Sequence, residues 1–133
     1  MDIFKYALIA RKHNARWAYF DGAAASIAAG ATTTNTHSPA ADYVLFPIYL
    51  IFGSPAASAS QDVTIRYDGE AIMNAITPLA SNIILPIPLQ AVRNAIIVSW
   101  TNNDGSASQV AYQIASLEIP RDNVNAFMKE IGV

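Results

Sequence analysis

The chain has 133 residues, of which 53% are apolar and only 14% are charged, and its formal net charge is −2. This length fits one domain with a sizeable core, and the weakly negative charge excludes a general electrostatic attraction to nucleic acid. Cysteine is absent, which excludes disulfide bridges and thiolate chemistry. Average soluble domains carry about 25% charged residues, so we expect a surface that is largely neutral or covered by other subunits.

Charge is unevenly distributed along the chain. The first 16 residues contain the basic side chains Lys5, Arg11, Lys12 and Arg16 against one carboxylate, whereas the rest of the chain has four basic residues against nine carboxylates. Four basic residues form at most a small patch, which favours a solvated face or a docking surface for an acidic neighbour over a nucleic-acid site. The same stretch lacks the layout of a signal peptide, so we expect a protein made in the cytoplasm.

The N-terminal third contains both ambiguous and neutral segments. Residues 1–14 fit either a helix or a strand, because their apolar positions suit both periods over so short a span. Arg16–Phe20 (RWAYF) has the composition of a short strand, and the Asp-Gly pair at 21–22 is a typical turn. Residues 23–41 are uncharged and rich in alanine and threonine. We expect a long neutral loop there, with room for a short strand at Ala31–Thr34, that lies against another subunit; a mobile surface loop is the alternative.

The segment Tyr43–Phe52 is apolar on both faces of a predicted strand. Such strands are common in parallel sheets, but the chain lacks the alternating strand–helix pattern of those proteins. The second face therefore needs a cover, which a loop, a terminal helix or a neighbouring subunit would supply. This run has ten residues and includes Pro47, so it is too short for a membrane-spanning helix. We expect a subunit interface formed by Tyr43, Leu45, Ile48, Tyr49 and Ile51, together with Ile27.

Residues 62–68 (DVTIRYD) alternate between polar and apolar, which predicts a strand. The Asp-Gly pair at 68–69 predicts a hairpin turn into a second strand, EAIMNAI. Residues 53–61 have the composition of a loop. Residues 82–89 (NIILPIPL) are extended, and their two prolines place them at a sheet edge or in an irregular strand.

Residues 94–119 predict two strands joined by the polar turn TNNDGSAS, and we interpret them as a hairpin. Trp100 shares one face of the first strand with Ile96, so we expect it in the core. In the second strand the apolar positions change from even to odd numbers before Leu117. This change predicts a β-bulge near 115–116.

The C-terminal segment predicts a short amphipathic helix, with Asp122 as its N-cap and Gly132 just after its end. Its apolar stripe is formed by Val124, Phe127, Met128 and Ile131. Together with seven or eight short strands, it predicts an all-β, mainly antiparallel fold. We expect one domain over residues 1–133, a β-sandwich or a jelly-roll-like fold.

Candidate residues for chemistry are few. His13 and His37 lack the neighbouring ligands of a metal site, and no serine lies in a nucleophile elbow, although a spatial triad would leave no such trace. Asp68 and Glu70 suit a solvated turn better than a glycosidase pair. The run 102–104 offers oxygens to a cation but does not fit an EF-hand. We therefore expect no catalytic, metal or cofactor site.

Two classes of function remain. The first is a structural subunit that forms a trimer or larger homo-oligomer or docks on other structural proteins, such as a viral or phage capsid, capsid-decorating or tail protein, which would then reside in the virion. The alternative is a small β-sandwich module that binds carbohydrate or protein. Trp17 and Tyr19 are then the expected ligand contacts, because Trp17, beside Arg16 and Tyr19, is the better exposed of the two tryptophans.

Overall fold

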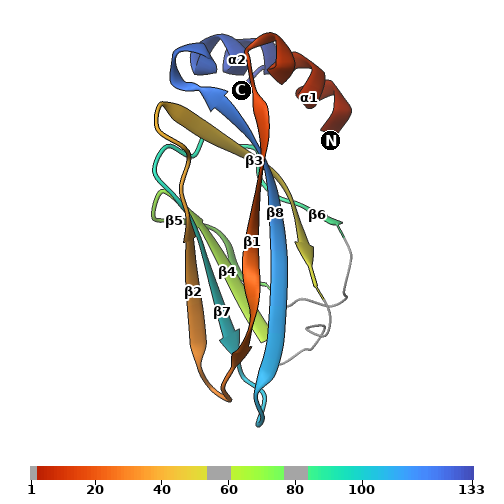
Figure 1. Ribbon diagram of the computed structural model, residues 1–133, viewed down its shortest axis with the longest axis vertical. Coiled ribbons are helices and arrows are strands. Elements are labelled where there is room, and N and C mark those ends of the chain that lie inside the picture. The colour runs from red at the N-terminus through yellow and green to blue at the C-terminus, as the bar shows by residue number, and fades with distance from the viewer. Residues whose placement is uncertain (1–2, 54–60, 77–83) are drawn as a thin grey trace.

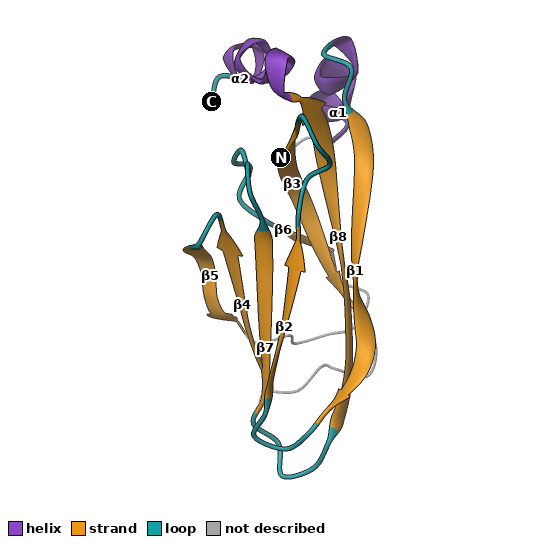
Figure 2. Cartoon of the chain, turned by 60° about the vertical axis from the view of Figure 1, so that its left-hand side comes forward, coloured by secondary structure: helices purple, strands orange, loops and turns teal. Residues whose placement is uncertain are grey.

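The structure is a computed structural model that describes residues 3–53, 61–76 and 84–133. Within these ranges, eight strands form two four-stranded antiparallel sheets that pack as a sandwich, and two helices lie together at one end (Figures 1 and 2). The predicted all-β, mainly antiparallel fold with a short C-terminal helix is confirmed. The expected loop at 53–61 lies mostly outside the described residues, as does the beginning of the expected strand at 82–89.

In chain order, the elements are α1 (Ile3–Lys12), β1 (Arg16–Ile27), β2 (Thr32–His37), β3 (Tyr43–Phe52), β4 (Gln61–Tyr67), β5 (Glu70–Ile76), β6 (Ile84–Pro86), β7 (Ile96–Asn102), β8 (Ser108–Pro120), a 3-10 turn (Arg121–Asn123) and α2 (Val124–Ile131). The predicted strands of the β4–β5 hairpin and their turn are confirmed. β6 is a short edge strand, as its prolines predicted.

The strand order is that of a jelly roll. Sheet A has the order β1-β8-β3-β6, and sheet B has the order β2-β7-β4-β5. Hydrogen-bonded neighbours therefore include the nested pairs β1 with β8, β2 with β7, β3 with β6 and β4 with β5. A chain folded into one long antiparallel hairpin and then wound into two sheets produces this nesting, which is the jelly-roll arrangement.

The two strands expected within residues 94–119 exist as β7 and β8, but the prediction that they pair as a hairpin is wrong. β7 lies between β2 and β4 in sheet B, whereas β8 lies between β1 and β3 in sheet A. Residues 103–107 therefore cross from one sheet to the other. The same turn-forming residues suit a crossing and a hairpin, so local composition cannot distinguish the two.

The first core lies between the two sheets. Inward positions of β4 and β7 are buried and alternate with half-buried outward positions, as their sequence patterns predicted. Trp100 is buried here, and its ring meets Phe52 edge-on, with 5.3 Å between the ring centroids. The predicted core position of Trp100 is confirmed.

A second core lies on the other face of sheet A, beneath the two helices (Figure 1). Its buried members are Ala10, Val44, Phe46, Ile48, Leu117, Ile119, Val124 and Phe127. The predicted apolar stripe of α2 is confirmed, since Val124 and Phe127 are buried while Met128 and Ile131 pack against the cluster. The helices therefore supply the cover that the second face of β3 requires.

β8 needs no bulge, because its two halves contribute to different cores. Tyr112 faces the first core and Leu117 faces the second, so even and odd positions are both buried by the fold. The predicted bulge in β8 is wrong. The irregularity at this level lies in the neighbouring β3, where the register shifts between Pro47 and Tyr49, opposite 115–116.

The prediction of a long neutral loop at 23–41 is wrong, because most of this stretch forms strands. β1 continues to Ile27, and β2 occupies Thr32–His37. The Asp-Gly pair at 21–22 does not end β1 either; Gly22 lies within the strand, opposite Tyr112 of β8. Threonine is β-branched and favours strands when a neighbour is available for pairing. Pairing with β8 and β7 thus overrides the loop-like composition.

The ambiguous N-terminal segment is a helix, α1, from Ile3 to Lys12. Its Ala10 is buried in the second core, which selects the helical period over the strand period. At the other end of the chain, the predicted N-cap role of Asp122 is wrong, because a 3-10 turn precedes α2 and no side chain caps it. Gly132 follows α2 with φ of 78°, as predicted.

Candidate functional site

A tight turn after α1 brings the chain back along the helix. Asn14 has φ of 60°, a left-handed conformation that asparagine adopts more readily than most residues. The amides of Asn14 and Ala15 donate hydrogen bonds to the carbonyl oxygens of Arg11 and Ala10 at 3.2 and 3.1 Å. This pair of bonds is a common helix ending that reverses the chain. One side of α1 therefore faces the beginning of β1.

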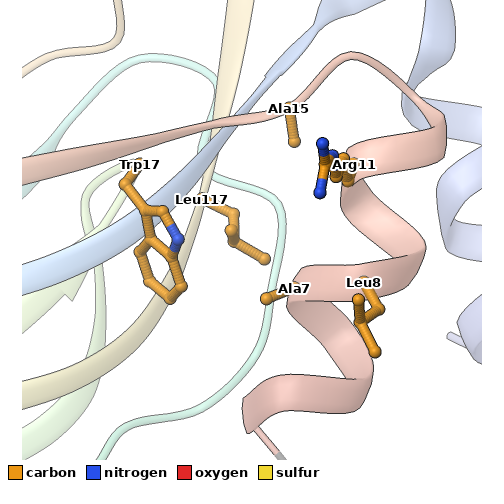
Figure 3. Close-up of a pocket in the computed structure, with 6 residues that line it drawn as sticks. All are labelled: Ala7, Leu8, Arg11, Ala15, Trp17 and Leu117. Carbon is orange, nitrogen blue, oxygen red and sulfur yellow. The ribbon is translucent and has the colours of Figure 1, made fainter.

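A pocket of about 370 Å³ opens between α1 and sheet A (Figure 3). Its lining consists of Ala7, Leu8 and Arg11 from α1, Ala15 from the turn, Trp17 from β1 and Leu117 from β8. Arg11 follows Leu8 by three positions and Ala7 by four, which places these residues on one side of α1. Trp17 and Leu117 are cross-strand partners on sheet A. The pocket is thus mainly apolar, with one cation.

Three large apolar side chains at or beside this pocket face solvent, and we name them the outer apolar patch. The exposed fractions are 66% for Leu8, 39% for Trp17 and 55% for Tyr19. The rings of Trp17 and Tyr19 stack with centroids 6.1 Å apart and planes 13° apart. The sequence singled out these two aromatics, and their contact with a ligand stays a prediction. Leu8 was missed because residues 1–14 had no assigned period.

Arg11 is the cation that lines the pocket, and no carboxylate of the described residues forms an ion pair with it. Two other members of the predicted basic patch are ion-paired: Lys12 lies 3.8 Å from Glu130, and Arg16 pairs within sheet A. Lys5 also has an interaction within the chain. The four basic residues are therefore divided among separate contacts, and Arg11 is the one placed at the pocket.

Glu118 is buried in sheet A and joins three segments. Its carboxylate accepts hydrogen bonds from Nε of Arg16 at 2.7 Å and from the amide of Ala40 at 2.9 Å. The guanidinium carbon of Arg16 lies 4.1 Å from the centre of the Tyr43 ring. This buried carboxylate is thus engaged in fastening the β2–β3 connection to sheet A.

The predicted subunit interface is corrected in part. Ile27, Leu45 and Ile48 are buried in the chain's own cores, so they offer no surface to another subunit. Leu45 and Ile48 are buried because the opposite sheet and the helices cover both faces of β3, and Ile27 of β1 lies in the core between the sheets. The other members of the predicted interface, all half-buried, are Tyr43, Tyr49 and Ile51. Their contact with another subunit stays a prediction.

His37 is half-buried and joins the two sheets. Its Nε2 atom lies 2.6 Å from the hydroxyl of Tyr112, and its ring packs 5.2 Å from that of Phe20. Burial lowers the pKa of His37, and the charge of Asp21 partly opposes this effect. Burial also raises the pKa of Tyr112 to about 12. Both groups are therefore neutral at neutral pH and form a structural hydrogen bond.

The oxygens considered for a cation belong to a hydrogen-bond network at one end of the sandwich. Nε2 of Gln61 donates to Oδ1 of Asn102 at 2.7 Å and to Oδ2 of Asp104 at 2.8 Å. Nε1 of Trp100 donates to Oε1 of Gln61, and Nδ2 of Asn102 donates to the carbonyl oxygen of Ile27. Across residues 3–53, 61–76 and 84–133, no group of three or more acidic, histidine or cysteine side chains is placed to hold a metal ion.

Asp68 anchors the loop that leads into β7. Its carboxylate accepts hydrogen bonds from the amides of Arg93, Asn94 and Ala95 at 3.0, 2.7 and 3.0 Å. Burial alone would raise the pKa of Asp68, but the three amides outweigh it and hold this pKa below its ordinary value. The turn interpretation of the Asp68-Gly69 pair is confirmed, since both residues have positive φ between β4 and β5.

The sequence matches no protein-family model, and it has no significant match among curated proteins. None of the helices in the described ranges is long and apolar enough to cross a membrane.

Proposed function

We propose that this protein is a non-enzymatic structural subunit that assembles with copies of itself or docks on other structural proteins, as a viral or phage capsid, capsid-decorating or tail component does. The outer apolar patch of Leu8, Trp17 and Tyr19 carries the proposal. Burying apolar surface is worth about 25 cal/mol per Å², and apolar side chains gathered around a surface hollow typically mark a contact site.

The chemistry of the pocket indicates what the partner presents. Aromatic residues and arginine are enriched at the centres of interfaces, and truncating them costs the most binding energy. Trp17 and Arg11, which line the same pocket, supply these two types. An apolar side chain fits the pocket, and a carboxylate fits Arg11. A second copy of this chain has such groups, because residues 17–133 carry nine carboxylates against four basic side chains.

Further support comes from the composition and from the fold. Only 14% of the residues are charged, which is typical of chains that share large permanent contacts. The jelly-roll strand order occurs in viral capsid proteins and in lectins, although a fold alone does not define a function. The buried Glu118 and the half-buried His37 are engaged in structural hydrogen bonds, so neither is offered to a substrate.

A small binding module is the second candidate, and the stacked pair of Trp17 and Tyr19 favours it. Exposed aromatic rings are suited to contact with the apolar face of a sugar. The adjoining pocket of about 370 Å³ is at the small end of the range for ligand sites, about 300–1,000 Å³.

The test of the first candidate is the solution mass by light scattering behind size exclusion. We expect the wild type to exceed the chain mass of 14.3 kDa, and we expect Leu8→Asp to lower the measured mass because it would bury a charge in an apolar contact. Ile84→Asp is the matched control, since Ile84 is 55% exposed on β6 and does not line the pocket. An unchanged mass for Leu8→Asp would contradict the docking role of the pocket.

The second candidate has a separate readout in tryptophan fluorescence. The chain has two tryptophans, and Trp100 is buried, so a ligand at the surface changes the emission of Trp17. A monomeric wild type whose emission shifts with soluble oligosaccharides, and whose shift disappears in Trp17→Ala, would favour the binding module. The absence of any shift would remove the carbohydrate-binding module.

A further inference from the structure

The four outermost strands of the two sheets differ in how their free edges are protected. β1 and β6 are the edges of sheet A, and β2 and β5 are the edges of sheet B. An edge strand presents unpaired N–H and C=O groups to which another strand can add. Natural proteins prevent this addition with prolines, charged residues, bulges or very short strands.

Three of the four edges carry such protection. β6 is three residues long and contains Pro86. β5 begins at Glu70, and its register with β4 shifts at two places. β1 contains the charged Arg16 and Asp21, and its register with β8 shifts between Gly22 and Ala25. Strand addition is disfavoured at each of these edges.

β2 carries none of these devices. Its sequence, TTTNTH, has no proline, acidic residue, lysine or arginine, and it pairs with β7 over six residue pairs without a register shift. The hydroxyls of Thr32 and Thr34 bond to those of Thr101 and Ser99 at 2.7 and 3.2 Å, which ties the exposed face of β2 to β7. No other segment of the described chain forms backbone hydrogen bonds with its outer edge. β2 is thus a regular, neutral and open edge.

We propose that the free edge of β2 pairs antiparallel with β2 of a second copy, which joins two four-stranded B sheets into one across a two-fold axis. Two identical strands related by such an axis form a self-complementary contact. Neither strand has an acidic or basic residue of fixed charge, so no like charges face one another, and threonine–threonine pairs across strands are favourable. A charged peptide would gain no ion pair at this edge, which favours a second copy as the occupant.

This contact deepens the proposed function, on which it rests, by naming one interface between copies. It uses sheet B, whereas the pocket lies at α1 and sheet A. The two contacts are therefore separable by mutation. Leu8→Asp removes the pocket contact and leaves the edge of β2 unchanged, so it provides the background in which the β2 contact is tested.

The experiment is sedimentation velocity on three proteins: Leu8→Asp alone, Leu8→Asp with Thr34→Lys, and Leu8→Asp with Asn74→Lys. We expect Leu8→Asp alone to form a dimer of twice the 14.3 kDa chain mass. Thr34→Lys should weaken this dimer by about ten-fold or more, because lysines near the two-fold axis repel each other. Asn74→Lys adds the same charge at the opposite edge of sheet B and should leave the dimer intact.

A charge-reversal mixture separates repulsion from misfolding. Thr34→Lys and Thr34→Glu proteins, each weakly associating alone, should form a dimer again when mixed in equal amounts. A monomeric Leu8→Asp protein overturns the β2 contact, and so does a dimer that Thr34→Lys leaves unchanged or a mixture that fails to re-associate. If Leu8→Asp lowers the wild-type mass all the way to that of a monomer, the pocket contact stands while the β2 contact falls. A monomeric wild type removes both.

Discussion

The ring of Tyr112 on β8 lies across Gly22 on β1, its cross-strand partner, so closely that a methyl group at Gly22 would overlap the ring. From this position the Tyr112 hydroxyl reaches Nε2 of His37 on sheet B at 2.6 Å. Glycine in a strand usually costs stability, but it allows a close approach of this kind. The absence of a side chain at Gly22 is what allows Tyr112 to join the two sheets.

Gly22→Ala is therefore expected to destabilise the protein. The added methyl displaces the Tyr112 ring and breaks its bond to His37, and overpacking of this kind typically costs about 1–3 kcal/mol. Urea unfolding followed by circular dichroism measures the change. Gly105→Ala is the control, because nothing lies within 4 Å of a Cβ at Gly105. Equal stability of the two variants would show that the Tyr112 ring moves aside at no cost.

His37 should make the stability depend on pH below neutrality. Burial lowers its folded-state pKa, whereas in the unfolded chain it titrates near its ordinary value of about 6.5. The unfolded state thus binds more protons, so the free energy of unfolding falls as pH decreases below about 6.5 and levels off below the folded-state pKa. His37→Asn should flatten this dependence, and His13→Asn should leave the contribution of His37 in place. A wild type with constant stability between about pH 7 and 5 would contradict the linkage.

The sequence predicted which strands are buried on one face and which on both faces. β4 and β7 alternate strictly because one face of each packs on the opposite sheet, so Val63, Ile65 and Trp100 could be assigned to a core. β3 is apolar on both faces, and its need for a second cover was predicted. The sequence did not predict whether a loop, a terminal helix or a neighbouring subunit forms this cover, because the answer depended on whether residues 1–14 form a helix.

The pairing of the strands and the position of the candidate site could not be predicted from the sequence, because both depend on residues that are far apart in the chain. The local pattern of residues 94–119 predicts two strands but not that β7 and β8 take partners in different sheets. The pocket needs Leu8, Trp17 and Leu117 together, and Leu117 lies 100 positions after Trp17. Only Trp17 and Tyr19 were predicted as surface residues of this site, because Trp17 was expected to be the better exposed of the two tryptophans.

Asn102→Ala should be strongly destabilising despite its position next to a loop. The Asn102 side chain accepts from Gln61 and the amide of Asp104 and donates to the carbonyl oxygens of Ile27 and Ser106. Removing the side chain leaves its buried partners without hydrogen bonds. Each buried donor or acceptor left unsatisfied lowers the free energy of unfolding by about 1–3 kcal/mol. Thermal unfolding by calorimetry measures the loss.

The neighbouring asparagine provides the matched control for that change. Asn103 is exposed, and its side chain bonds to Asp62 at the surface. Asn103→Ala should change the free energy of unfolding by no more than about 0.5 kcal/mol. If both variants lose the same stability, the network does not depend on the burial of Asn102.

Asp68 should contribute to resistance against acid. Its folded-state pKa is held below the ordinary value by the amides of Arg93, Asn94 and Ala95. The stabilisation is therefore complete above the unfolded-state pKa of about 3.9 and is lost as pH falls through the folded-state pKa. Asp68→Asn keeps the shape but not the charge, and should lower the neutral-pH free energy of unfolding by about 1 kcal/mol, since the site is largely exposed.

The acid dependence distinguishes this role of Asp68 from a general effect of losing a carboxylate. Urea unfolding between about pH 5 and 2 should show a smaller loss of stability for Asp68→Asn than for the wild type. Glu70→Gln is the control, because Glu70 lies on the other side of the same turn and accepts none of the three amides. Parallel acid curves for the wild type and Asp68→Asn would mean that the loop before β7 holds its position without the charge. In that case Asp68 would act through turn geometry alone, and its positive φ of 50° would be the feature to mutate next.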